Sequence, residues 1–391
     1  MTTPASMSTP TPVATPPPLL SVRDLTVTFG RGTHTVSAVD AVSFDIDAGE
    51  TLGLVGESGC GKSTTGRALM RIVVPTAGRV ELDGVDLTHQ RGRELRRTRT
   101  RMQMIFQDPI SSLNPRRRVR DIVAEPLDCW HLMRGAERDA FVDDLLVKVG
   151  IDPLTYGSRY PRSFSGGQCQ RISIARSLAM RPQLLICDEM VSALDVSVQA
   201  QILNLLEDLK AQYGLTLLFI AHDLAVVKNV SDRVAVMYLG RLCEIGPSTT
   251  LYESPAHPYT TYLLGAALEA DPTSRARPDV LEGEPPSPLN PPSGCRFRTR
   301  CPRASDRCAS ETPALREVAP GHRVACHFPL VRVVDDNRRV VAVVKGPVVG
   351  LHSWLSGSVK LHWALSSGLA FSRACSAAPH PPRRLRRGAW P

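Results

Sequence analysis

A glycine-rich stretch between an apolar run and a helical pattern constrains this sequence most. It fits the pattern G-x-x-x-x-G-K-[ST]. The apolar run 51–55 before it predicts a buried strand, and residues 64–70 after it predict the first turns of a helix. Glycines let backbone N–H groups turn toward phosphate oxygens, and a helix N-terminus adds partial positive charge. These flanks disfavour a chance glycine turn, and the stretch predicts a nucleotide-binding loop made of Gly56, Glu57, Ser58, Gly59, Cys60, Gly61, Lys62, Ser63 and Thr64.

Four polar side chains have predicted roles in such a site. Lys62 can reach the β- and γ-phosphates, and the Ser63 hydroxyl can ligate Mg²⁺. The run 184–189 predicts an apolar strand that ends in two carboxylates. Beside a phosphate loop, Asp188 would join the Mg²⁺ shell and Glu189 would polarise a water for attack on the γ-phosphate. Taken alone, an acidic pair at a strand end is more simply a solvated terminus.

Three further candidates lie at the ends of predicted strands. An apolar strand predicted at 104–109 carries Gln107 toward its end. His222 follows the apolar run 215–220, on the edge where open α/β sheets bind ligands, although capping the strand is an alternative role. Phe29 ends the first alternating strand, where its ring can stack on an adenine or pack in the core.

A second small-residue turn opens a helix further along the chain. It comprises Ser165, Gly166, Gly167 and Gln168, and it is either another phosphate-binding helix N-terminus or a surface turn. Residues 116–150 have a mostly helical pattern, with an amphipathic stretch at 136–149. The other predicted elements are strands at 22–29, 42–46, 78–84, 234–239 and 241–245 and a helix at 202–209.

The net charge of +9 is unevenly distributed over the 391 residues. From residue 331 onward there are ten Lys/Arg and two Asp/Glu, which leaves about +1 for the first 330 residues. This near-neutral body, without a basic stretch interleaved with aromatics, argues against a nucleic-acid partner. The length exceeds one ordinary core, so a main domain with an appendage is expected.

The two ends of the sequence predict little ordered structure. Residues 1–18 are Thr/Pro-rich and have neither the basic nor the apolar region of a secretory signal, which predicts a disordered leader. The basic tail 331–391 is expected to be disordered, with weak attraction to anionic lipid as the alternative. No uncharged apolar run reaches the roughly 18 residues of a membrane span, so membrane association is expected through a partner.

The order of these motifs resembles the nucleotide-binding subunit of ABC transporters over residues 20–265. Within that family the sequence is most similar to the oligopeptide/dipeptide permease branch, and there to its F-type ATPase subunit. The resemblance implies an α/β P-loop NTPase fold with an antiparallel β subdomain, a helical subdomain and a small Cys-rich C-terminal appendage. The segments that carry the narrower resemblance are 56–61, 106–109, 111–116, 256–260 and 290–295.

The resemblance also implies roles for individual residues. Gln107 would contact Mg²⁺ and sense a transmembrane subunit, and His222 would hold the γ-phosphate and the attacking water. The turn at 165–168 would close over ATP bound to an opposing subunit, so that two subunits enclose two ATP molecules head to tail. One departure is Met190, because the family usually has proline after the catalytic glutamate. Since Met190 is not itself a catalytic group, hydrolysis is expected to survive.

Four cysteines lie in a Pro- and Arg-rich segment with little apolar content, which predicts a stapled appendage. They are separated by five, six and seventeen residues, unlike common zinc patterns. Four thiolates suit either Zn²⁺ or an iron–sulfur cluster, and nearby arginines could offset the cluster's charge. The resemblance favours a [4Fe–4S] cluster over zinc and over unligated thiols. The four are Cys295, Cys301, Cys308 and Cys326; four others, Cys60, Cys129, Cys187 and Cys243, are expected to be ordinary thiols.

We therefore expect an ATP-hydrolysing subunit of an importer of oligopeptides or dipeptides, which uses ATP and Mg²⁺. Its expected partners are a second ABC ATPase subunit in a heterodimer, two transmembrane permease subunits and an extracytoplasmic peptide-binding protein. It would lie peripherally at the cytoplasmic face of the cell membrane. Nickel chelates or glutathione-like solutes are alternative cargoes, and a soluble ABC ATPase acting on nucleic acid or a non-hydrolysing regulatory subunit are alternative classes. The expected domains are the ATPase at 19–270 and the C-terminal region at 271–330.

Overall fold

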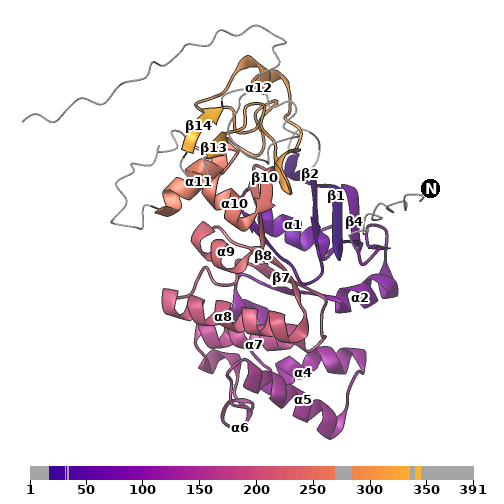
Figure 1. Cartoon of the computed structure of the whole chain (residues 1–391). Helices are drawn as coiled ribbons and strands as arrows, with labels where there is room; N and C mark the ends of the chain where they lie inside the picture. Colours follow the sequence, from indigo (N-terminus) through magenta and orange to yellow (C-terminus); the bar gives the residue numbers. More distant parts are fainter. Residues whose placement is uncertain (1–16, 31, 33–34, 269–283, 335–339, 345–391) are drawn as a thin grey trace, which may run out of the picture. The chain divides into compact units, whose positions relative to one another are not determined.

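A computed structural model describes residues 17–30, 32, 35–268, 284–334 and 340–344 (Figure 1). Its first layer is a four-stranded antiparallel sheet in the order β2-β1-β4-β5. Buried and partly exposed residues alternate along β1, as expected when only one face of a sheet is covered. The strands are β1 Leu20–Phe29, β2 Val36–Ile46, β4 Ala77–Leu82 and β5 Val85–Asp86.

The second layer is an eight-stranded sheet in the order β11-β12-β10-β9-β3-β8-β7-β6. Strands β6, β7, β8, β3 and β9 run parallel, while the β9–β10–β12–β11 end is antiparallel. Every residue of β3, β7 and β8 is buried, because helices cover both faces of a parallel sheet. The strands are β3 Thr51–Val55, β6 Met102–Ile105, β7 Leu184–Asp188, β8 Thr216–Ile220, β9 Arg233–Tyr238, β10 Arg241–Pro247, β11 Arg316–Ala319 and β12 His322–Val324.

Helix α1 (Lys62–Leu69) packs between the two sheets and contacts β1, β2, β7 and β8. Helix α7 (Gly166–Leu178) contacts β6 and α8 on the other side, next to the helical group that contains α4 and α5 (Figure 1). The remaining described elements are α2 Gly92–Thr100, α3 Pro109–Ser112, α4 Val119–Trp130, α5 Gly135–Lys148, α6 Pro153–Tyr156, η2 Pro161–Ser163, α8 Val196–Tyr213, α9 Leu224–Val230, α10 Ser248–Glu253, α11 Pro258–Leu268, α12 Asp306–Ser310, β13 Val331–Val334 and β14 Val340–Val344.

The predicted α/β fold with an antiparallel sheet and a helical group is confirmed, and one local prediction needs correction. Strand β6 ends at Ile105, so Gln107 lies in the following loop, where Asp108 caps α3 by accepting the Ile110 N–H at 2.9 Å. The helical pattern predicted at 116–150 corresponds to helices α4 and α5, and the amphipathic stretch at 136–149 to α5. His131 adopts a left-handed φ of 54° and ends the first helix. Among the described helices, none is long and apolar enough to cross a bilayer.

The Cys-rich C-terminal region contributes strands to the main sheet. Residues Glu244 and Ile245 of β10 pair with Val324 and Arg323 of β12. The predicted boundary between residues 270 and 271 lies outside the described residues, and so do residues 1–16 of the predicted leader. Within the predicted tail, the structure describes strands β13 and β14, which pair antiparallel.

A buried carboxylate ties this region to the ATPase sheet. Glu244 is fully buried in β10, and its oxygens accept hydrogen bonds from the Ala256 N–H at 2.7 Å and the His257 N–H at 2.9 Å. His322 Nε2 of β12 lies 2.6 Å from Glu244 Oε1. One side chain thus joins β10, β12 and the segment before α11, and it satisfies donors that water cannot reach.

We expect Glu244→Ala to lower the free energy of unfolding by about 3 kcal/mol, because it leaves buried donors without an acceptor. The measurement is chemical denaturation of the purified chain. Glu207→Ala, at an exposed position of α8, serves as the control and should stay within about 0.5 kcal/mol of wild type. Equal stabilities of the two variants would contradict this role of Glu244.

Candidate nucleotide-binding site

The loop between β3 and α1 has the tightly turned backbone conformation that its glycines predict. Gly56, Gly59 and Gly61 have φ values of 151°, 76° and 107°, in the region that side chains disfavour. A Cβ on Gly56 would lie 2.1 Å from the Met237 carbonyl oxygen, and one on Gly61 would lie 2.1 Å from that of Ala38. Neither position can carry a side chain without moving backbone.

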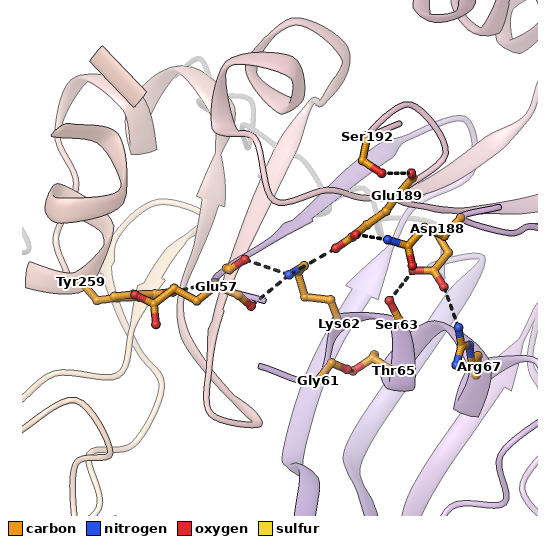
Figure 2. Close-up of polar contacts among 12 residues, drawn as sticks. Glu57, Gly61, Lys62, Ser63, Thr65, Arg67, Asp188, Glu189, Ser192 and Tyr259 are labelled. Atoms are coloured by element: carbon orange, nitrogen blue, oxygen red, sulfur yellow. Dashed lines mark hydrogen bonds and ion pairs between the residues drawn. The ribbon is translucent and has the colours of Figure 1, made fainter. Parts of the chain in front are cut away.

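Lys62 opens α1 and lies at the centre of the site, between the loop and Glu189 (Figure 2). Its side chain is 3% exposed, and its Nζ donates to the carbonyl oxygens of Gly56 at 2.8 Å and Glu57 at 3.1 Å. Glu189 Oε1 lies 3.7 Å from the same Nζ. A buried cation at a loop whose amides can converge on phosphates is suited to binding a polyphosphate.

Asp188 and Ser63 come together from β7 and α1, as the sequence predicts. The Ser63 hydroxyl donates to Asp188 Oδ1 at 2.5 Å, and Arg67 lies 3.6 Å from Asp188 Oδ2 (Figure 2). Burial raises the pKa of the Asp188 carboxyl, and the Ser63 hydrogen bond and Arg67 oppose that shift. Oδ2 is buried and accepts no hydrogen bond. The hydroxyl and this under-coordinated carboxylate are the hard oxygen ligands that Mg²⁺ requires, so the residues fit the ion.

Glu189 lies beside Asp188 at the carboxyl end of β7. Its Oε2 accepts a hydrogen bond from Gln107 Nε2 at 2.9 Å, although 82 residues separate the two in sequence. Glu189 has a φ of 48°, and its carbonyl oxygen accepts the Ser192 hydroxyl at 2.9 Å. Met190, which replaces the proline usual in the family, is 2% exposed and packs in the core. Packing and the Ser192 hydrogen bond therefore hold the turn after Glu189.

His222 and Glu189 line the same small cavity. The cavity is lined by Glu189, Ser192, Gln199 and His222, with Val191, Ala221, Asp223 and Val226. The imidazole is exposed and lies at the end of β8, adjacent to β7 in the sheet. A carboxylate and an imidazole thus line one space that can hold a water.

The other loop residues differ in exposure. Ser58 and Gly59 are exposed, and Thr64 is partly exposed in the first turn of α1. Cys60 is 3% exposed, and burial raises the pKa of its thiol to about 11, so the thiol is neutral at physiological pH. Phe29 is 45% exposed at the end of β1, so its ring is available to a ligand rather than packed in the core.

The turn at 165–168 is separate from the Lys62 loop. Ser165 forms a capping box with Gln168: its hydroxyl accepts the Gln168 N–H at 3.3 Å, and its own N–H donates to Gln168 Oε1 at 3.0 Å. A Cβ on Gly167 would lie 2.5 Å from a methyl group of Val198, which requires glycine where α7 meets α8. Gly166 starts α7. The hydrogen bonds described for Ser165 and Gln168 lie within the turn and its helix.

Sequence reasoning missed three residues that contact this site. Arg67 pairs with Asp188, as described above. The Tyr259 hydroxyl of α11 accepts the Glu57 N–H at 2.9 Å, and Arg300 Nη1 donates to both oxygens of the Glu57 carboxylate at 2.9 and 3.0 Å. The segment 256–260, singled out for its resemblance, contains Tyr259; no local pattern in the sequence relates Arg300 to residue 57.

The four cysteines of the C-terminal region line one cavity, together with His257, Arg298, Arg303 and His327. The cysteines of the described residues are free thiols. Burial raises the pKa of Cys295, Cys301 and Cys326, in the last case to about 12, and it lowers the pKa of His257 to about 4. All of these groups are therefore neutral at pH 7.

The predicted [4Fe–4S] cluster is not supported by this arrangement. Within the described ranges, no group of three or more His, Cys, Asp or Glu side chains is positioned to hold a metal ion. The thiols are the right residue type, but their present spacing does not fit a metal. Five arginines are predicted to offset a cluster's charge: Arg296, Arg298, Arg300, Arg303 and Arg307. Three of them have carboxylate partners: Arg296 pairs with Asp40, Arg300 with Glu57 and Arg307 with Glu311.

Comparison with known proteins identifies the family. Residues 39–192 match the ABC transporter family, and residues 243–308 match the oligopeptide/dipeptide transporter C-terminal region. A probable peptide ABC transporter ATP-binding protein, y4tS of Sinorhizobium fredii, is 55% identical over 76% of this chain and 84% of its own length. The putative oligopeptide transport ATP-binding protein YkfD of Bacillus subtilis is 53% identical over 82% of this chain and 98% of its own.

Solved structures agree on the fold. The ATP-binding cassette MJ0796, in a dimeric post-hydrolysis state bound to ADP and Pi, is 27% identical with a TM-score of 0.54 over 59% of this chain and 98% of its own. CbiO1 of Clostridium perfringens, part of the ABC transporter complex cbiONQ, is 27% identical with a TM-score of 0.55 over 61% of this chain and 91% of its own. The chain belongs to the ATP-binding proteins of ABC transporters, and within them to the oligopeptide/dipeptide type.

Proposed function

We propose that this chain is the ATP-hydrolysing subunit of a peptide importer. The observation that carries the proposal is the meeting of Lys62, Ser63, Asp188 and Glu189 at one edge of the sheet, in a chain of this family. Its relatives are named for the transport of peptides or oligopeptides, which favours peptide cargo over nickel chelates or glutathione-like solutes. The matched C-terminal region favours the same cargo class.

Binding of ATP would use the phosphate loop. Lys62 Nζ would exchange its bonds to the Gly56 and Glu57 carbonyls for β- and γ-phosphate oxygens. Ser63 and Asp188 would hold Mg²⁺, which offsets the charge of the phosphates. Gln107, hydrogen-bonded to Glu189 next to this pair, would complete the Mg²⁺ contacts. Phe29 would stack on the adenine.

Hydrolysis would use the carboxylate and imidazole of the cavity between β7 and β8. Glu189 would accept a proton from the attacking water, and His222 would hold that water and the γ-phosphate in line. The turn made of Ser165, Gly166, Gly167 and Gln168 would complete the site of a second ATPase subunit, which we propose to be a different chain in a heterodimer. Because ATP contacts both subunits, its hydrolysis would release the pair and move the permease subunits.

The family implies peripheral association with a membrane transporter that has permease subunits and a substrate-binding protein. We place this chain at the cytoplasmic face, because the ATP that it consumes is there. The nearly neutral first 330 residues give no support to a nucleic-acid partner.

We expect Lys62→Ala to abolish detectable MgATP binding, because the phosphates lose their buried cation. The measurement is titration of the purified chain with ATP by calorimetry. Lys148→Ala, on α5 and paired with Asp144, is the matched control and should bind ATP as wild type does. Undiminished ATP binding by Lys62→Ala would refute the assignment of the site.

We expect Glu189→Gln to bind ATP but to hydrolyse it at least about 100-fold more slowly, because the amide cannot accept the proton of the water. With its partner subunit present, the variant should accumulate as an ATP-bound dimer in size-exclusion chromatography. Glu137→Gln, exposed on α5, is the control. Normal turnover by Glu189→Gln would exclude Glu189 as the catalytic base.

We also propose that the cavity formed by the four cysteines binds an anionic [4Fe–4S] cluster. The cysteines would ligate it as thiolates after a local rearrangement of their side chains. Two observations support this: the four thiols share one cavity, and the buried Nη1 of Arg303, which also lines the cavity, has no hydrogen-bond partner. Chain purified without oxygen should then be brown and contain about four irons, and Cys326→Ser should remove the colour while Cys129→Ser, at an exposed site, should not. A colourless preparation containing only zinc would contradict the cluster.

A further inference from the structure

Glu57 of the phosphate loop makes three polar contacts, and two of them join the loop to α11 and to the C-terminal region. The Glu57 N–H donates to Tyr259, the Glu57 carboxylate accepts from Arg300, and the Glu57 carbonyl accepts from Lys62. The first two partners come from residues beyond the family's ATPase segment 39–192. Figure 2 shows Tyr259 and Lys62 on either side of Glu57.

The Arg300–Glu57 pair is shielded from water. The Arg300 side chain is 7% exposed and that of Glu57 is 24% exposed. Arg300 Nη1 donates to both carboxylate oxygens and lies 3.5 Å from the Tyr238 hydroxyl. Because little solvent reaches this ion pair, salt screens it less than it screens an ion pair at the surface. The charges of Arg300 and Glu57 therefore act more strongly on neighbouring groups.

An aromatic cluster fixes the turn that carries Arg300. The Arg300 N–H donates to the Phe297 carbonyl at 3.0 Å. The Phe297 ring is 1% exposed and lies 5.3 Å from the ring centroids of both Tyr238 and Tyr259. The same packed rings therefore set the positions of the Arg300 guanidinium and the Tyr259 hydroxyl.

The negative charge of the Glu57 carboxylate has to be offset by a positive charge nearby. Glu57 is the second residue of a loop that binds the anionic phosphates of ATP, and an unpaired negative charge there would repel them. Arg300 offsets that charge through its two hydrogen bonds to the carboxylate. Tyr259 fixes the Glu57 backbone, whose carbonyl in turn holds Lys62.

We propose that Arg300 is a positioning residue of the ATP site: it neutralises Glu57 and fixes the phosphate loop from the C-terminal region. This makes residues 284–330 part of the nucleotide site rather than an appendage beside it. The inference rests on the proposed function, because it requires that the loop bind ATP.

The experiment is titration of the full chain with MgATP in five forms: wild type, Arg300→Ala, Arg300→Lys, Glu57→Gln with Arg300→Ala, and Arg307→Ala. Arg307 is the matched control, because it lies in the same region but forms an exposed ion pair with Glu311. We expect Arg300→Ala to raise the ATP dissociation constant about tenfold, equivalent to about 1.4 kcal/mol. Arg300→Lys should lie between Arg300→Ala and wild type, since it keeps the charge but not the planar fork.

The double variant distinguishes charge compensation from a general loss of structure. Removing the Glu57 charge should restore the affinity of the Arg300→Ala chain to within about threefold of wild type, whereas damage to the fold would not be repaired. In hydrolysis assays, Arg300→Ala should raise KM for ATP more than it lowers kcat. Melting curves of every variant identify any that is unfolded.

Several results would overturn the inference. A folded Arg300→Ala chain with wild-type affinity would do so, as would a double variant no better than Arg300→Ala or an equal loss in Arg307→Ala. The Lys62→Ala chain separates these failures from failure of the proposed function. If wild type binds ATP and Lys62→Ala does not, an unaffected Arg300→Ala chain refutes only the role of Arg300; if wild type itself ignores MgATP, the ATP site is wrong.

Discussion

The phosphate loop depends on direct contact between backbones. Gly56 and Gly61 lie against the carbonyl oxygens of Met237 and Ala38, at distances that leave no room for a Cβ. The Gly240 N–H, in the turn between β9 and β10, donates to the Cys60 carbonyl at 2.8 Å. The loop is thus held between the antiparallel sheet and the main sheet, and α1 begins from that fixed point. The positions of Lys62 and Ser63 follow from it.

The charged and polar side chains of the site are largely buried, and they pair with one another. Lys62 is close to Glu189, Ser63 and Arg67 contact Asp188, and Gln107 contacts Glu189. Burial of Asp188 opposes its charged form, so a bound cation would replace the solvation that the strand removes. The same low-dielectric surroundings strengthen every interaction with a phosphate, which is how a few side chains can bind and activate ATP.

The C-terminal region contacts the ATPase part of the chain next to the nucleotide site. Strand β12 extends the main sheet, Glu244 bonds to the segment before α11, and Arg296 and Arg300 pair with Asp40 and Glu57. Two of the arginines that the sequence suggests for a metal cluster, Arg296 and Arg300, therefore have carboxylate partners in the ATPase part of the chain. The cysteines next to them share a cavity, but in the described structure they do not form a metal site.

The sequence by itself determined the family, the phosphate loop and most of the parallel strands. Continuous apolar runs, a glycine pattern and strand-end carboxylates are local signals, and their order along the chain fixes the type of fold. It erred on the end of β6, because a strand end depends on turn geometry that composition encodes weakly. Only the tertiary structure could relate Arg300 to Glu57, separated by 243 residues, or show that Gln107 donates directly to Glu189. Such pairs arise from sheet order and packing, for which the sequence holds no local signal.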